Sequence, residues 1–562
     1  MTRWIRLPGL TQAREYQRSW LRGDVIAGLT VSAYLIPQVM AYAGVAGLPP
    51  VAGLWAAAPC LAIYALLGSS RSLSLGPEAS TALMTAVAIG PLARSDTARY
   101  AALATTLALL VGVLCVLAGL ARLGFIADLL SRPVIVGYMA GLAATMIAGQ
   151  LGKLTGTPVT GRTFLAQLTS FGTNLASVRP ATTLLSTGVL AFLFVVAARW
   201  PSMPGPLIAV AGATAVVWIF GLASHGVAVV GPVPSGLPPV SLPDLRPGDL
   251  RDLIGPAFTV LVMAFTDDVL TARAFVQSGE EIDANAELIA LGVANVAAGF
   301  VRAFPVSSSA SRTAIGRASG SRTQLYSLTA AAVMLAVLGF GHTLLAQFPD
   351  AALGAIVIYA AVQLVDVTAL RRLVAFRRRE LLIAVVACAG VLIVNLLYGV
   401  LIAIGISVAE LLVRVARPHD AVLGQVPGLA GMHDVEDYPS AETIPGLVVY
   451  RYDAPLFFAN AEDFRRRALA AAGSQSPVRW FVLNVEANVE VDFTALEALE
   501  AVRAELTGRG VVFALARAKQ ELLARLTSFG LTGRIGNELI FPTLPTAVAA
   551  YRQWSRQHPP AD

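Results

Sequence analysis

An arginine stands beside a group of serines in an otherwise apolar part of the chain. The group consists of Ser307, Ser308, Ser309, Ser311 and Arg312. An ionised side chain inside a hydrophobic span costs about 2.5–3.5 kcal/mol, so such an arginine normally faces a polar cavity and a partner. A guanidinium group binds oxyanions through two parallel hydrogen bonds, and serine hydroxyls add donors that can turn toward the same oxyanion. The pattern indicates an anion site; the alternatives are a loop arginine and serines that only cap a helix.

A second segment of the same kind begins with the residues Gly76, Pro77, Glu78 and Ala79. Both segments, 78–92 and 308–317, are too short to cross a bilayer, and both open with proline or serine, which favour a helix start. Two helix N-termini that point at one spot present free N–H groups and partial positive charge to an anion. The alternative interpretation is that the two short segments are kinks with only a structural role.

The rest of the sequence predicts the membrane helices that would hold these segments. Of the 562 residues, 56% are hydrophobic and 14% are charged, whereas soluble proteins carry about 25% charged residues. Apolar stretches long enough to cross about 30 Å of hydrocarbon recur along the chain. They cover residues 24–44, 50–68, 101–121, 134–152, 182–199, 206–222, 253–276, 284–301, 324–347, 351–365, 380–395 and 396–416.

The number of apolar segments and the distribution of arginines predict how these segments are arranged. The two short segments are third and tenth of about fourteen, the same place in each half of a seven-plus-seven order. Such paired interruptions indicate a transporter of inverted repeats with its site near the midplane. Arginines cluster before Asp24, at Arg122 and Arg132, and at 371–379, which by the positive-inside rule places both termini in the cytoplasm. The sequence thus predicts a polytopic α-helical protein of the cell membrane.

The composition changes near Val415, where charge rises and strand-like and helix-like runs alternate. Strands are expected at 447–452, 480–485, 511–516 and 538–541, and helices at 461–472, 494–509, 519–529 and 544–554. This alternation predicts a small cytoplasmic α/β domain. The expected divisions are an N-terminal cytoplasmic segment 1–22, a membrane domain 23–417, a linker 418–445 and the α/β domain 446–556.

Several motifs carry a family resemblance that covers nearly the whole chain. The run YLIPQVMAYA at 34–43, followed by AGLPP at 46–50 and GLW at 53–55, closely resembles the first-helix signature of SulP anion permeases. DANAEL at 283–288 and SRT at 311–313 resemble that family's eighth-to-tenth helix region. The C-terminal domain is similar to STAS domains. The resemblance implies core and gate helix bundles, a homodimer and an elevator-like movement of the anion.

The resemblance also assigns roles to particular residues. Gln38 and Tyr42, four apart on one helix face, correspond to residues that line the anion cavity, and Arg312 corresponds to a residue beside the anion. Asp267 corresponds to an acidic position of the eighth helix. It is expected to neutralise Arg312 in the empty carrier and to take up a proton when a dianion binds, the alternative being a static ion pair. Its neighbour Asp268 is expected to face the lumen.

Glu78 departs from the small or apolar residue that is usual in the family at this place. A carboxylate next to an anion site repels the anion unless it is protonated, so Glu78 either faces away or is a second proton-coupling group. In the STAS-like domain, Thr494 falls where related antagonists are phosphorylated. It is therefore a candidate regulatory residue, and the alternative is a capping box formed by Thr494 and Glu497.

The expected function is proton-coupled secondary transport of sulfate across the cytoplasmic membrane. The five histidines have no metal-ligand spacing and the chain has no P-loop, so we expect no enzyme activity, metal, cofactor or ATP coupling. Bicarbonate, chloride or a dicarboxylate are alternative substrates, and a nucleobase symporter or a non-transporting sensor are rival functions. The expected partners are the lipid bilayer, a second copy of the chain and a possible cytoplasmic regulator of the STAS-like domain, but no nucleic acid.

Overall fold

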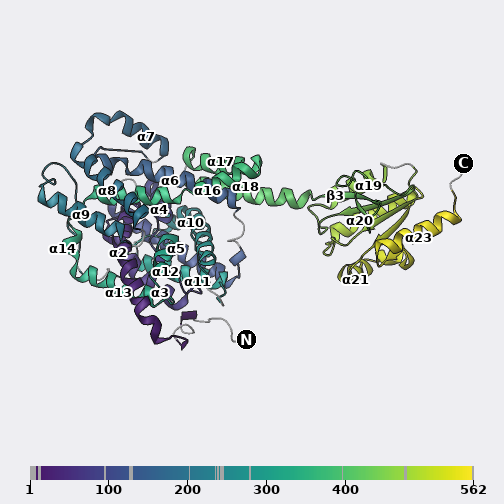
Figure 1. The fold of residues 1–562 in the computed structure, drawn as a ribbon, viewed down its shortest axis with the longest axis horizontal. Helices are drawn as coiled ribbons and strands as arrows, with labels where there is room; N and C mark the ends of the chain where they lie inside the picture. Colours follow the sequence, from purple (N-terminus) through teal and green to yellow (C-terminus); the bar gives the residue numbers. More distant parts are fainter. Residues whose placement is uncertain are drawn as a thin grey trace. The chain divides into compact units, whose positions relative to one another are not determined.

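The chain divides into two compact units, Met1–Ser407 and Val408–Asp562. The computed structural model describes residues 8–9, 14–93, 96–125, 131–161, 163–200, 203–234, 236, 240, 243, 246–276, 280–394, 396–473 and 477–559. The first unit is built of helices, and the second contains a sheet with helices around it (Figure 1).

Every span and short segment that the sequence predicts for the membrane contains a helix. The helices up to the start of the sheet are η1 (Arg18–Trp20), α2 (Leu21–Val45), α3 (Val51–Leu67), α4 (Ala79–Ala93), α5 (Thr97–Leu120), α6 (Arg132–Thr155), α7 (Phe164–Thr173), η3 (Leu175–Ser177), α8 (Pro180–Arg199), α9 (Gly205–Ile219), α10 (Pro247–Ala274), α11 (Ala284–Phe300), α12 (Ala310–Ala318), α13 (Leu325–Phe340), α14 (His342–Leu345), α15 (Asp350–Leu364), α16 (Val367–Phe376), α17 (Arg378–Ile393) and α18 (Leu396–Ala416). The short helices α7 and α16 do not correspond to predicted spans, and the predicted span 324–347 is divided into α13 and α14.

Local chemistry explains where helices start. α5 begins at Thr97, earlier than expected, because the Asp96 side chain accepts hydrogen bonds from the N–H groups of Ala98 and Arg99 and so caps the helix. Within the described ranges, six helical stretches are long and apolar enough to cross a membrane, and two of them join neighbouring helices, η1 with α2 and α15 with α16. They cover Arg18–Val45, Thr97–Leu120, Arg132–Thr155, Pro180–Arg199, Gly248–Ala274 and Asp350–Phe376.

The helices of the first unit pack in two sets. In one set, α5 lies along α11, α13 packs on α2 and α3, and α10 packs on α5. In the other set, α6 packs against α15 and α17, and α15 packs against α8. Small side chains allow close approach in the first set: a Cβ added to Gly112 of α5 would lie 2.6 Å from the backbone N of Val296 in α11.

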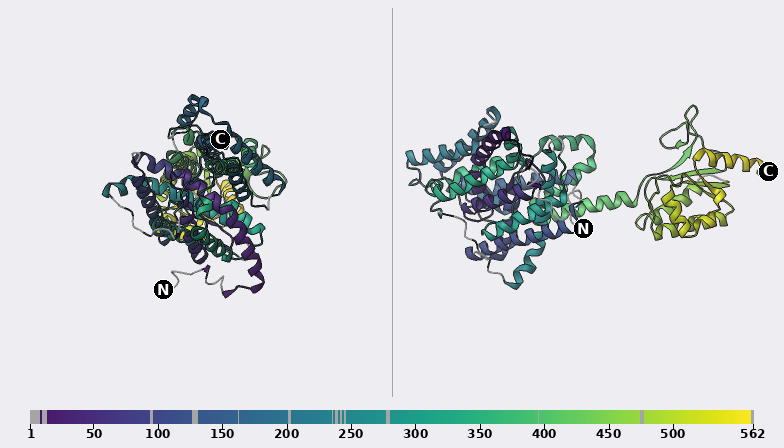
Figure 2. Two further views of the ribbon diagram at one scale, coloured as in Figure 1. Left: turned by 90° about the vertical axis from the view of Figure 1, so that its left-hand side faces the viewer. Right: turned by 90° about the horizontal axis from the view of Figure 1, so that it is seen from below.

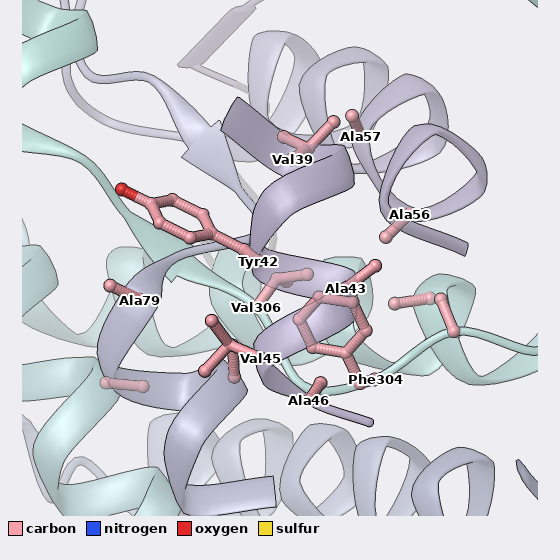
Figure 3. Packing of buried hydrophobic residues seen from close by; sticks show 14 of the residues in the cluster. Val39, Tyr42, Ala43, Val45, Ala46, Ala56, Ala57, Ala79, Phe304 and Val306 are labelled. Carbon is pink, nitrogen blue, oxygen red and sulfur yellow. The ribbon is translucent and has the colours of Figure 1, made fainter. Parts of the chain in front are cut away.

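A continuous apolar core fills the first unit. Figure 3 shows part of it, where Ala43 of α2 and Ala46, which follows α2, lie near Ala56 of α3 and near Phe304 and Val306 from the segment before α12. Each of these side chains is at most 1% exposed. The core therefore anchors the segments on which the two short helices depend.

Two short strands lie inside this helical unit. β1 (Leu75–Gly76) pairs antiparallel with β2 (Ser307–Ser308), with Leu75 opposite Ser308 and Gly76 opposite Ser307. α4 follows β1 and α12 follows β2 after short turns. The pairing brings the N-termini of the two short helices together, as the sequence predicts.

The second unit is a six-stranded sheet with the order β4-β3-β5-β6-β7-β8. Its strands are β3 (Asp420–Gly424), β4 (His433–Asp434), β5 (Leu447–Tyr452), β6 (Trp480–Asn484), β7 (Val512–Ala516) and β8 (Ile540–Phe541), and its helices are α19 (Ala461–Gly473), α20 (Phe493–Gly508), α21 (Gln520–Ser528), α22 (Leu531–Ile535), η4 (Asn537–Leu539) and α23 (Leu544–Gln557). β5 to β8 are parallel. These elements lie close to the predicted strands and helices.

Alternate residues of each central strand pack into two separate apolar cores, one on each face of the sheet. Val448 and Tyr450 of β5 face a core with α19 to α22, whereas Leu447 and Val449 face a core with α23. Figure 2 shows α23 on one face of the sheet and the remaining helices on the other. This period of two is what a strand buried on both faces requires.

The structure corrects two expectations for this unit. Residues 418–445 are not only a linker, because β3 pairs with β5 and joins the sheet. The helix that contains Thr494 is not capped by it: Asp492 is the N-cap and accepts a hydrogen bond of 2.8 Å from the N–H of Ala495. A carboxylate at this position also interacts favourably with the helix dipole, which explains why the helix starts one residue earlier.

Candidate functional site

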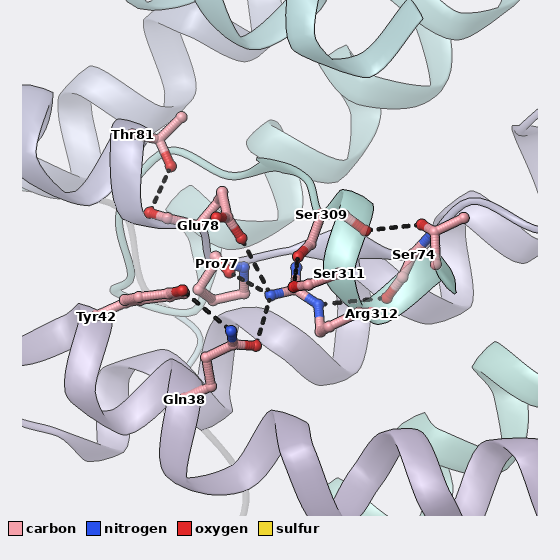
Figure 4. Close-up of polar contacts among 10 residues, drawn as sticks. Gln38, Tyr42, Ser74, Pro77, Glu78, Thr81, Ser309, Ser311 and Arg312 are labelled. Carbon is pink, nitrogen blue, oxygen red and sulfur yellow. Dashed lines mark hydrogen bonds and ion pairs between the residues drawn. The ribbon is translucent and has the colours of Figure 1, made fainter. Parts of the chain in front are cut away.

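The site forms around the guanidinium group of Arg312, which has no exposed surface. Its Nη1 donates to the carbonyl oxygen of Pro77 at 3.0 Å, to Oε1 of Gln38 at 3.3 Å and to Oε2 of Glu78 at 3.3 Å. Its Nε donates to the Ser74 hydroxyl at 3.4 Å. Figure 4 shows these contacts converging on Arg312 from α2, from Ser74 just before β1 and from the segment between β1 and α4.

One donor of Arg312 is free. Nη2 has no hydrogen-bond partner in the part of the chain that the structure describes. The same holds for the hydroxyls of Ser307 and Ser308, which are buried in β2. Buried donors without partners are costly, so the Ser308 hydroxyl, which lines the cavity described below, indicates where an acceptor from outside the chain would bind.

A cavity of about 500 Å³ lies between the two helix sets. From the first set it is lined by Gln38, Tyr42, Glu78, Asp267, Ser308, Ser309 and Ser311, and from the second set by Leu193, Pro206, Ile356, Tyr359 and Gln363 among others. Gln38 is held in the wall by a hydrogen bond of 3.0 Å from its Nε2 to the Tyr42 hydroxyl. The wall on the first side is polar and rich in hydrogen-bonding groups.

Most of the site residues expected from the sequence meet here. Gln38, Tyr42, Glu78, Ser308, Ser309 and Ser311 line the cavity, whereas Gly76 and Ser307 are the paired strand residues behind it. Pro77 supplies a carbonyl acceptor for Arg312, and Ala79 opens α4. Arg312 itself lies behind the wall, because Gln38 and Glu78 stand between its guanidinium group and the cavity.

The prediction that Asp267 pairs with Arg312 is wrong. Glu78, not Asp267, forms the ion pair with Arg312, because the guanidinium group turns toward the β1–α4 segment. Asp267 lines the cavity from α10. Asp268 does not face a lumen as expected: it is fully buried, beside Glu287 of α11.

Several site residues were missed by the sequence analysis. Ser74 lies in the same polar stretch as Gly76 but had no assigned role, and it accepts from Arg312. Tyr359 and Gln363 of α15 line the cavity from the second helix set. A polar pair four residues apart at the end of an apolar helix is the signal that could have found them.

Thr494 lies in the other unit, exposed in the first turn of α20. Its hydroxyl is therefore accessible, and its role stays a prediction. No group of three or more His, Cys, Asp or Glu within the described ranges could hold a metal ion.

Packed apolar helices around a polar cavity, joined to an α/β unit, define a multi-pass membrane transporter. The chain belongs to the sulfate permease family, whose model matches residues 21–387, and the STAS domain model matches residues 438–547. This family consists of transporters rather than enzymes, so the resemblance noted in the sequence is confirmed.

Curated relatives of the chain include bacterial and plant proteins. The chain is 58% identical over 550 residues to a probable sulfate transporter of Mycobacterium tuberculosis, covering 97% of this chain and 98% of the relative. It is 30% identical over 568 residues to the high affinity sulfate transporter 2 of Stylosanthes hamata, covering 97% and 86%.

Solved structures share the fold. The murine Solute Carrier 26 family member A9 anion transporter, in its inward-facing state, matches with a TM-score of 0.89 at 23% identity and covers 97% of this chain and 94% of its own. The transmembrane domain of the cyanobacterial bicarbonate transporter BicA matches with a TM-score of 0.61 at 24% identity, over 70% of this chain and 98% of its own. The chain therefore has the fold of these membrane transporters.

Proposed function

We propose that this protein transports sulfate across the cytoplasmic membrane, and that the anion binds where β1 and β2 lead into α4 and α12. The observation that carries the proposal is a polar cavity lined by the Ser308 hydroxyl, a buried donor without a partner, with the unpaired Nη2 of Arg312 behind the wall that Gln38 and Glu78 form. Tetrahedral oxyanions suit such donors because they accept several hydrogen bonds at once. The names of the relatives, which are sulfate transporters, support sulfate as the substrate.

Proton coupling follows from the ion pair that covers Arg312. A dianion that reaches Arg312 competes with the Glu78 carboxylate, which sits 3.3 Å from Nη1. Protonation of Glu78 weakens its hold on Arg312 and removes the repulsion between its carboxylate and the anion. The proton therefore enters with sulfate. Asp267, which lines the same cavity, is the second carboxyl that could carry it.

An elevator-like mechanism is supported by the two helix sets. The anion-binding groups all belong to the set that contains α2, α4, α10 and α12, whereas α8, α9 and α15 form the opposite wall. A rigid first set could carry the anion past the second. We further propose a homodimer with both termini in the cytoplasm, on the basis of the family resemblance and the arginine distribution.

Uptake by the purified protein in proteoliposomes tests this function. Labelled sulfate, chloride and bicarbonate are offered in turn, with and without an inward proton gradient. We expect sulfate to accumulate and the gradient to increase its accumulation. Uptake of chloride or bicarbonate without sulfate uptake would contradict the proposed substrate.

A further inference from the structure

Two buried carboxyl groups lie together away from the cavity. Asp268 of α10 and Glu287 of α11 both have 0% exposed surface, and the Asp268 carboxyl lies beside the Glu287 carboxyl and the Ser308 hydroxyl. The neighbouring Asp267 lines the cavity, but Asp268 does not. The pair is thus separate from the carboxyl groups that face the anion.

The two carboxyl groups differ in their hydrogen bonds. Glu287 accepts from the Tyr64 hydroxyl at 2.9 Å, from the N–H of Ser69 at 2.7 Å and from the Ser69 hydroxyl at 2.6 Å. Neither oxygen of Asp268 accepts a hydrogen bond from a donor in the described ranges. Glu287 therefore accepts three hydrogen bonds, whereas the one side-chain donor beside Asp268 is the Ser308 hydroxyl, which is itself without a partner in the described ranges.

The described residues around Asp268 and Glu287 also provide no positive charge to compensate these two carboxyl groups. The titratable groups that face Asp268 are Tyr64 from α3, Cys115 from α5, Asp267 on its own helix and Glu287 from α11. No ion pair to Asp268 or Glu287 occurs among the residues whose placement is described. Two ionised carboxylates side by side, with no cationic side chain of the described residues paired to either, repel each other strongly.

We propose that Asp268 and Glu287 form a proton-binding site, in which Asp268 carries the proton and donates it in a hydrogen bond to the Glu287 carboxylate. This arrangement supplies the partner that each group lacks, because a protonated carboxyl is a donor. The Ser308 hydroxyl lies beside the pair and belongs to β2, which leads to the anion site. The pair therefore keeps one negative charge rather than two behind β2.

The site holds its proton with or without sulfate, so the inference does not depend on the proposed function. The test compares Asp268→Asn, Glu287→Gln and the control Asp267→Asn in purified, detergent-solubilised protein. Infrared absorption at neutral pH should contain the carbonyl band of a protonated carboxylic acid. We expect Asp268→Asn to remove part of this band and Asp267→Asn to leave that part in place. An unchanged band in Asp268→Asn would overturn the proposal.

Thermal unfolding gives a second, independent readout. The amide of Asp268→Asn can still donate to Glu287, so its melting temperature should stay near that of the wild type. Glu287→Gln should lower the melting temperature by several degrees, because it removes the carboxylate that accepts these hydrogen bonds. An unfolded chain has lost the Asp268 proton at neutral pH, so wild-type stability should fall with rising pH relative to Asp268→Asn. If Asp268→Asn fails to fold, or is as destabilised as Glu287→Gln, Asp268 does not act as the donor.

Discussion

Arg312 and Glu78 are paired where neither charge is freely solvated, since the side chain of Arg312 is 0% exposed and that of Glu78 12%. Removing one member of such a buried pair typically costs about 3–5 kcal/mol, because the other charge is left without a partner. The ion pair is thus stable when no anion is bound. The distance of 3.3 Å between Nη1 of Arg312 and Oε2 of Glu78 is nevertheless long enough for a stronger acceptor to replace the carboxylate. A doubly charged oxyanion is such an acceptor.

Replacing Arg312 should abolish sulfate uptake. A hydrogen bond to a charged group contributes about 1.5–3 kcal/mol, so Arg312→Ala should weaken transport at least about tenfold. Arg312→Lys keeps the charge but not the forked geometry, and should recover only part of the activity. Labelled sulfate uptake into proteoliposomes measures this.

The matched control for Arg312 is Arg317, which lies exposed near the end of the same helix and donates to the carbonyl of Phe275. Arg317→Ala should transport sulfate like the wild type. Combining Arg312→Ala with Glu78→Gln should restore the thermal stability that Arg312→Ala alone loses, because no unpaired buried charge remains. The double variant should still not take up sulfate. Normal uptake by Arg312→Ala would exclude Arg312 from the site.

A titratable pair outside the membrane predicts a pH-dependent stability. His419 Nε2 and Asp434 Oδ2 are 2.8 Å apart, and the hydrogen bond to the Asp434 carboxylate raises the pKa of His419. Stability from this pair is therefore full below the usual histidine value of about 6.5 and is lost as the pH rises through the raised pKa. Denaturant unfolding of residues 418–559 on the alkaline side of that value should show the loss. His419→Gln should not show it, and equal pH profiles would refute the link.

At the scale of elements, the site depends on where β2 lies. Asn295 of α11 holds the segment before β2: its Nδ2 donates to the carbonyl of Val306 at 3.2 Å, and its Oδ1 accepts from the N–H of Val306 at 2.9 Å. Both groups are buried. The position of the Ser307 and Ser308 hydroxyls is thus fixed by a side chain from a neighbouring helix.

Asn295→Leu should weaken sulfate binding without unfolding the protein. Leucine has the same branched shape as asparagine but leaves the two backbone groups of Val306 unpaired, at about 1–3 kcal/mol each. The segment that contains Val306 can shift so that these two groups find other hydrogen-bond partners. The hydroxyls of Ser307 and Ser308 then shift with it. The apparent affinity for sulfate, measured by uptake at increasing concentration, should fall several-fold. Asn285→Leu on the same helix, which removes a contact to Gly124 instead, should keep the wild-type affinity.

The sequence allowed the elements to be predicted better than their contacts. The helices and the strands β5 to β7 follow from apolar runs and from β-branched residues, and they lie close to the expected positions. β3 was missed because Asp420–Gly424 lies in a stretch rich in proline and glycine. The partner of Arg312 could not be predicted, because it depends on the register of β1 with β2, which turns the guanidinium group toward Glu78 rather than toward Asp267.

At the scale of the molecule, the chain consists of two units with separate cores. The second unit has an apolar core on each face of its sheet, which is sufficient for a domain of this size to fold by itself. The matches to two family models divide the chain in the same way.

Deletion from Pro418 onward should therefore leave a membrane unit that can be purified in a monodisperse form. The cut lies after α18, so no helix of the first unit is interrupted. Gel filtration and thermal unfolding in detergent measure the outcome, and sulfate uptake should fall if the second unit regulates transport. A truncated chain that only aggregates would show that the two units are not independent.

The coupling of sulfate to protons is tested most directly by comparing exchange with net uptake in Glu78→Gln. Glutamine mimics the protonated carboxyl, so sulfate counterflow should persist while net uptake loses its dependence on an inward proton gradient. Asp267→Asn, the matched change in the other cavity carboxyl, should keep that dependence. Full proton-driven accumulation of sulfate by Glu78→Gln, together with its loss in Asp267→Asn, would contradict this account and assign the proton to Asp267.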